Sequence, residues 1–177
     1  NNLFFRDPFQ VYSSISTEHL ESSLNLYDSL LISLKKPLYL SQAYYRLGDI
    51  HYRILQDFDK AYYLLSKAIN FKPTKKTKLK IINRTSDVLI AMGQTNEALS
   101  FLQEQIRIEP LEGLNEKVLL IKFLTAPPDS ILYNIELSFN NIDQSDHSFN
   151  DLMELKSLIF KYCNENSNHE SFKYFQK

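Results

Sequence analysis

Apolar residues recur at helical rather than strand spacing along almost the whole chain. An early stripe of such residues consists of Leu20, Leu24, Tyr27, Leu31 and Leu34. A late stripe consists of Leu152, Leu155, Ile159, Tyr162 and Cys163. Side chains three or four positions apart share one face of an α-helix, whereas a half-buried strand needs strict alternation, which is hard to find here. We therefore expect an all-α fold.

Capping residues, prolines and glycines divide this pattern into short helices of similar length. The expected helices cover residues 17 to 35, 39 to 55, 58 to 71, 76 to 92, 95 to 108, 112 to 125, 129 to 141, 148 to 164 and, as a ninth, 168 to 176. Such short connections favour antiparallel neighbours stacked in order. Pro8 and the early aromatic residues favour an extended arm over residues 1 to 16. The sequence thus predicts an arm followed by one helical domain, residues 17 to 177, with eight or nine helices.

The middle of the chain contains a repeat. Ala61 matches Ala98, Leu65 matches Leu102 and Pro73 matches Pro110, and the two members of each pair are 37 residues apart. Tyr44 matches Ile82 at nearly the same spacing. A fixed period of this size indicates stacked units of two helices each.

Residues 44 to 73 carry the most specific motif. Its first half reads Tyr44-x-x-Leu47-Gly48-x-x-His51-Tyr52, and its second half reads Ala61-x-x-x-Leu65-x-x-Ala68 followed by Pro73. The pattern resembles the tetratricopeptide repeat (TPR) family over residues 41 to 110. The resemblance implies a right-handed stack of antiparallel helix pairs, an α-solenoid, whose concave surface is lined mainly by the first helix of each pair and binds other proteins.

The residue sizes in this motif favour close helix packing independently of the family. Gly48 on one helix and Ala61 and Ala68 on the other let two backbones approach, while Leu47 and Leu65 fill the space beside them.

The flanking sequence departs from the motif at several points. The second repeat, residues 79 to 110, has Thr85-Ser86 in place of Leu-Gly. One extra residue lies in the turn around Gln56-Asp57. Residues 17 to 37 and 112 to 164 fit helix pairs of similar size without the motif, so they are either degenerate repeats or unrelated packing helices.

Composition excludes several classes of function. The chain has 177 residues, 44% of them hydrophobic, and a net charge of −1, so it can bury a core but has no global attraction to nucleic acid or anionic lipid. Its apolar runs fall far short of the roughly 20 residues that a membrane helix needs. Its three glycines are too far apart for a phosphate-binding loop. We expect neither a membrane span nor a cofactor.

The cysteine content and the start of the chain bear on its origin. Cys163 is the single cysteine and cannot form an internal disulfide, which favours a reducing compartment, cytoplasm or nucleus. The first residues show neither an initiator Met nor a secretory leader. We expect the chain to be a piece of a longer protein.

Few residues suggest chemistry. His51 lies near Asp49, but the repeat register favours a histidine that replaces an aromatic packing residue. Asp143, Asp146, His147 and Asp151 could offer ligands to a metal, although a solvated loop before a helix capped by Ser148 is the better interpretation. The sequence predicts a protein without catalytic or metal-binding residues.

The expected function is therefore protein binding by surfaces that the helices display. Removing the packing positions leaves a candidate concave face made of Gln42, Tyr45, Arg46, Asp49, Tyr52, Arg53, Lys80, Asn83, Arg84 and Asp87. Tyrosine and arginine are typical of binding faces, and an ordinary solvated helix surface is the alternative. Lys80 and Arg84 resemble part of the carboxylate clamp of chaperone-binding TPR domains, but Asp49 and Asp87 would repel an anionic tail.

A basic segment is the runner-up site. Lys72, Lys75, Lys76 and Lys78 precede Lys80 and Arg84 without an intervening acid. Cations at the start of a helix oppose its dipole, so a partner such as nucleic acid, phosphate or an acidic protein segment is worth considering. A solvated loop between repeats is the alternative.

The arm is a third candidate surface. It carries Leu3, Phe4, Phe5, Phe9, Val11 and Tyr12. Exposed side chains of this kind would promote aggregation, so we expect the arm to pack on its own chain, on a partner or on a second copy.

Overall fold

The computed structural model describes residues 17–140, 142–143, 145 and 147–162. These residues form eight α-helices and one π-helical turn, with no β-strand among them, which confirms the all-α prediction. The arm at residues 1–16, the ninth helix at 168–176 and Cys163 lie outside the described residues. The chain divides into two compact units, residues 1–78 and residues 79–177.

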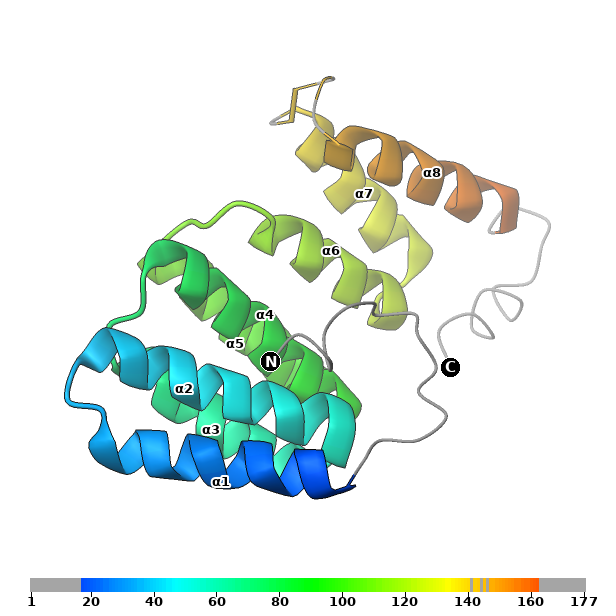
Figure 1. Cartoon of the computed structure of the whole chain (residues 1–177). Coiled ribbons are helices and arrows are strands. Elements are labelled where there is room, and N and C mark those ends of the chain that lie inside the picture. Colours follow the sequence, from blue (N-terminus) through cyan, green and yellow to red (C-terminus); the bar gives the residue numbers. More distant parts are fainter. Residues whose placement is uncertain (1–16, 141, 144, 146, 163–177) are drawn as a thin grey trace. The chain divides into compact units, whose positions relative to one another are not determined.

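The first unit is built from three α-helices that follow one another in the chain (Figure 1). They are α1 (Thr17–Ser33), α2 (Pro37–Ile50), which runs on into a π-helical turn (His51–Leu55), and α3 (Phe58–Asn70). α2 begins two residues earlier than expected because Pro37 occupies its first turn, where the missing N–H costs nothing. The Asp57 side chain caps α3 by accepting a hydrogen bond of 3.1 Å from the Lys60 backbone N–H.

α2 and α3 pack closely at the small residues of the motif. A Cβ atom added to Gly48 would lie 2.8 Å from Cγ of Leu65 and 3.3 Å from the backbone oxygen of Ala61. Ala61 and Ala68 have no exposed surface, and Leu47 is 3% exposed. The prediction that small residues set the distance between these helices is therefore confirmed.

Aromatic rings and the α1 stripe complete this core. The rings of Tyr44 and Phe71 stack with centroids 5.4 Å apart and planes 5° from parallel. Apolar residues of α1, among them Tyr27 and Leu24, pack against the buried residues of α2 and α3. The apolar stripe predicted from the sequence is thus the buried face of α1.

The extra residue of the first turn is absorbed by a local widening of the helix. The His51 carbonyl oxygen accepts hydrogen bonds from the backbone N–H groups of Gln56 and Asp57, which are five and six positions along the chain instead of four. Gln56 then adopts a left-handed conformation with φ of 53°. A non-glycine residue pays about 1–2 kcal/mol for that conformation.

Replacing Gln56 by glycine should therefore stabilise the protein by up to about 1 kcal/mol, because glycine adopts positive φ without steric cost. Urea unfolding of the full chain measures the change. The matched variant is Gln103→Gly in the middle of α5 (Thr95–Ile108), which should destabilise by about 1 kcal/mol. A destabilised Gln56→Gly protein would contradict the described turn.

The second unit contains most of α4 (Lys75–Ala91) and all of the four helices that follow it. α4 begins in the last residues of the first unit and is followed by α5, α6 (Leu114–Thr125), α7 (Pro128–Phe139) and α8 (His147–Tyr162). Four expected starts shift by one or two residues, and the first of them is α4, which begins at Lys75 instead of residue 76. α6 begins after Gly113, whose φ of 83° excludes it from the helix, α7 begins at Pro128 instead of Asp129, and α8 begins before Ser148.

An apolar cluster shared by three helices holds the C-terminal part of this unit together. Leu119, Ile131, Ile135, Leu152 and Ile159 form a buried cluster shared by α6, α7 and α8, and these helices follow one another in Figure 1. This part of the chain lacks the repeat motif, yet its apolar residues are buried between its own helices.

The hydroxyl residues that replace Leu-Gly in α4 are buried without loss of hydrogen bonds. Thr85 is 3% exposed and donates to the Ile81 carbonyl at 2.8 Å, while Ser86 is fully buried and donates to the Asn83 carbonyl at 2.8 Å. Each small hydroxyl is therefore satisfied by its own helix.

In the part of the chain that the structure describes, no helix is long and apolar enough to cross a membrane.

Candidate functional site

The predicted face of the first unit is only partly at the surface. Gln42, Arg46 and Arg53 are exposed and Tyr52 is half-buried. Tyr45 and Asp49, however, are only 9% and 2% exposed, so the expectation that α2 displays them to solvent is wrong.

The reason lies in the periodicity of α2. Ser41, Tyr45 and Asp49 are four residues apart and form a second buried stripe beside the apolar one. Removing only the motif positions from the sequence could not reveal that stripe. The Arg46 guanidinium stays at the surface and lies 5.7 Å from the centre of the Tyr45 ring, which is within the range of a cation–π contact.

The predicted face of the second unit forms a charged network. Arg84 Nη1 lies 3.3 Å from Asp87 Oδ2 on the same helix, α4. Lys117 Nζ of α6 lies 2.5 Å from Asp87 Oδ1 and donates to the Asn83 carbonyl at 3.0 Å. Lys80, one turn earlier on α4, is exposed. Lys117 was missed by the sequence analysis because its partners are 30 and 34 positions away and no motif covers α6.

A largely apolar groove of about 450 Å³ adjoins this network. It lies among α4, α6 and α8, and Gly113 of the loop before α6 also lines it. The apolar side chains that line it are Ile90, Leu119, Leu120, Ile121, Leu152 and Leu155. Leu120 is 57% exposed although it is a large apolar residue. The groove therefore offers apolar surface that the described residues leave open to solvent.

The polar lining of the groove is mainly acidic. It consists of Asn83, Asp87, Glu116, Lys117 and Asp151. Lys117 is neutralised by Asp87, which leaves the carboxylates of Glu116 and Asp151 without an ion pair to any described residue. Glu116 Oε2 is also buried without a hydrogen-bond partner.

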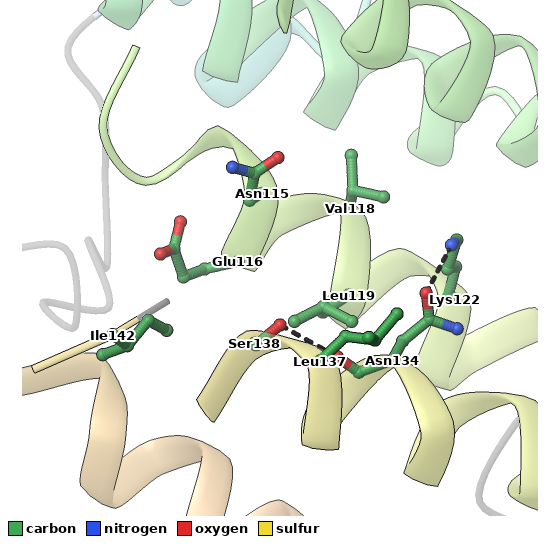
Figure 2. Close-up of a pocket in the computed structure, with 9 residues that line it drawn as sticks. All are labelled: Asn115, Glu116, Val118, Leu119, Lys122, Asn134, Leu137, Ser138 and Ile142. Carbon is green, nitrogen blue, oxygen red and sulfur yellow. Dashed lines mark hydrogen bonds between the residues drawn. The ribbon is translucent and has the colours of Figure 1, made fainter. Parts of the chain in front are cut away.

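A second cleft, of about 390 Å³, lies on the other side of Glu116 between α6 and α7 (Figure 2). Three of its polar residues bond to one another. Lys122 Nζ donates to Asn134 Oδ1 at 3.0 Å, and Ser138 Oγ donates to the Asn134 carbonyl at 2.9 Å. Glu116 lines this cleft as well as the groove among α4, α6 and α8.

His51 packs in the interior of the first unit. It is 4% exposed, and its Nδ1 lies 3.5 Å from Asp57 Oδ2, which is too long for a strong hydrogen bond. Burial lowers the pKa of His51 below its ordinary value, Lys60 lowers it further, and Asp57 and Asp28 oppose the shift. The buried position agrees with the interpretation of His51 as a packing residue.

The lowered pKa of His51 makes stability depend on pH in a defined direction. Because the unfolded chain binds the proton more readily, the contribution of His51 is complete above pH 6.5 and is lost as the pH falls below that value. In that window the free energy of unfolding falls by at most about 1.4 kcal/mol per pH unit. We expect His51→Phe to remove this component, as measured by urea unfolding between pH 5 and pH 8. His19→Phe, at an exposed position of α1, is the matched control, and equal slopes for wild type and His51→Phe would contradict the prediction.

The acidic loop before α8 shows a local turn. Asp143 Oδ1 accepts hydrogen bonds from the Ser145 backbone N–H at 2.9 Å and from Ser145 Oγ at 2.8 Å, and these bonds lower the pKa of Asp143. Asp146 and the His147 side chain lie outside the described residues. Among those described, no group of three or more His, Cys, Asp or Glu side chains is placed to hold a metal ion.

The basic segment is at the surface. Lys72, Lys75 and Lys76 are exposed and Lys78 is half-buried at the start of α4. Thr74 caps this helix end, since its Oγ1 accepts from the Thr77 N–H at 3.3 Å, which offsets part of the cost of cations there.

Comparison of the chain with protein-family models, curated proteins and solved structures finds no match.

Proposed function

We propose that this chain is a non-catalytic scaffold that binds a peptide or a helix of a partner protein within a larger complex. The observation that carries the proposal is the open apolar groove among α4, α6 and α8. A rigid, preformed groove binds a partner segment with little ordering cost on its own side.

The helices that line the groove support a TPR-like arrangement. In a right-handed stack of antiparallel helix pairs, the first helices of successive pairs line the concave surface. α4 is the first helix of the second motif unit, and α6 and α8 alternate with it along the chain. Asn83 and Asp87, two residues predicted for the concave face, line the groove.

Quantitative affinity capture from a cell lysate tests the function. The bait is the full chain, used with nuclease treatment and compared with Leu120→Ser, which removes apolar surface from the groove. The control is Leu26→Ser on α1, where the leucine is similarly exposed, 60% against 57%. We expect stoichiometric proteins that survive nuclease and are lost with Leu120→Ser but not with Leu26→Ser. Equal capture by both variants would contradict the proposal.

Nucleic-acid or phosphate binding is the second candidate, because Lys72, Lys75 and Lys76 are exposed and form no ion pair with a described residue. Such binding would weaken steeply with salt and would follow these lysines. The charge-reversed variant Lys75→Glu/Lys76→Glu separates the candidates. Loss of captured material with this variant and with nuclease, and not with Leu120→Ser, would favour nucleic acid.

We place the protein in the cytoplasm or nucleus on the strength of its single cysteine.

A further inference from the structure

We propose that the groove among α4, α6 and α8 selects a basic amphipathic segment, in which a lysine or arginine accompanies large apolar side chains. This inference names the partner chemistry of the groove and rests on the proposed function. It is carried by the combination of an apolar floor with two carboxylates, those of Glu116 and Asp151, that form no ion pair with a described residue.

The apolar floor of the groove indicates that the ligand carries large apolar side chains. Leu119 and Leu152 are buried at 6% and 5% exposure, whereas Leu120 remains more than half exposed at the same site. A leucine, isoleucine or phenylalanine of a partner would cover Leu120 and remove that surface from water, at about 25 cal/mol per Å². Partner helices bind such grooves through apolar residues three or four positions apart.

The Glu116 carboxylate indicates that the ligand also carries a positively charged group. Its Oε2 is buried and has no hydrogen-bond partner, and a buried acceptor without a donor is costly. Figure 2 shows that Glu116 and Lys122 of the same helix lie at different ends of the neighbouring cleft, where Lys122 bonds to Asn134. An ammonium or guanidinium group brought by a partner would supply the donor that the described residues do not.

Asp151 extends the same preference across the groove. It is exposed near the start of α8 and forms no ion pair with a described residue. Asp87 cannot serve an incoming cation in the same way, because Arg84 and Lys117 already contact it. Glu116 of α6 and Asp151 of α8 therefore make the groove attractive to cations and repulsive to acidic peptides and nucleic acid.

Selection of peptides from a random display library tests the inference. The immobilised target is the full chain, and peptides that also bind Leu120→Ser are removed. We expect the remaining sequences to combine lysine or arginine with large apolar residues. Fluorescence anisotropy with a selected synthetic peptide then measures affinity for wild type, for Glu116→Gln/Asp151→Asn and for the control Glu112→Gln/Glu154→Gln, whose residues are exposed outside the groove.

The affinity should fall about tenfold or more in the first double variant, since hydrogen bonds to charged groups are among the stronger ones, and it should be unchanged in the control. Neutral or acidic peptides that depend on Leu120 would overturn the basic preference and leave the scaffold function standing. If no selected peptide depends on Leu120, both the inference and the proposed function of the groove fail. Peptides that match the arm at residues 1 to 16 would identify a segment of this chain as the occupant and overturn the assignment to a partner.

Discussion

Replacing Gly48 by alanine is expected to destabilise the protein by about 1–3 kcal/mol, although alanine is normally the better helix former by about 1 kcal/mol. The new Cβ would lie 2.8 Å from Cγ of Leu65, a distance that folded proteins do not tolerate. Leu65 cannot move aside because it is fully buried, and the other close neighbour is the backbone oxygen of Ala61. Urea unfolding of the full chain measures the change.

The variant Leu65→Ala supplies the control for Gly48→Ala. On its own it should destabilise by about 2–5 kcal/mol because it leaves a cavity. In that background the steric conflict is gone, so Gly48→Ala should become neutral or stabilising. Equal effects of Gly48→Ala in both backgrounds would show that the contact between α2 and α3 does not determine the choice of glycine.

Replacing Ile135 by alanine should destabilise the second unit by about 2–5 kcal/mol. Ile135 of α7 has no exposed surface and lies in the cluster that α6, α7 and α8 share. No repeat motif covers this region, so the variant tests whether its helices depend on a packed core of their own. Thermal and urea unfolding followed by circular dichroism measure the loss.

Leu137→Ala is the matched control for Ile135→Ala. It lies two residues away on the same helix and is 45% exposed, so its truncation should cost less than about 1 kcal/mol. Similar losses at both positions would mean that the buried face of α7 is assigned wrongly.

The helices could be predicted from the sequence because their signals are local. The apolar stripe that includes Tyr27 became the buried face of α1, and the small residues Gly48 and Ala61 became the contact between α2 and α3. The predicted first residues of the helices were less accurate where the conformation of one residue sets the start of the helix. Gly113 does so for α6, because its positive φ excludes it from the helix. The turn at Gln56 shows the same limit, since an extra residue can be absorbed by a wider helical turn as well as by a loop.

The candidate site could be predicted only in part because it depends on neighbours far away in the chain. Tyr45 and Asp49 lie outside the motif positions and were predicted to be at the surface, but with Ser41 they form a second buried stripe of α2. Asn83 and Asp87 were predicted for the binding face and do line the groove. Their bonds to Lys117 join α4 to α6, and no spacing rule connects residues so far apart. Glu116 looks like an ordinary helix-surface acid until its buried oxygen is seen.

Site-specific photo-crosslinking in living cells tests the central claim most directly. A benzophenone amino acid would replace Leu120 in the groove or, as the control, Leu26 on α1, which is similarly exposed. The scaffold function predicts discrete protein adducts from position 120 that position 26 does not give. The absence of protein adducts from position 120, or the same adducts from both positions, would contradict a protein-binding groove among α4, α6 and α8.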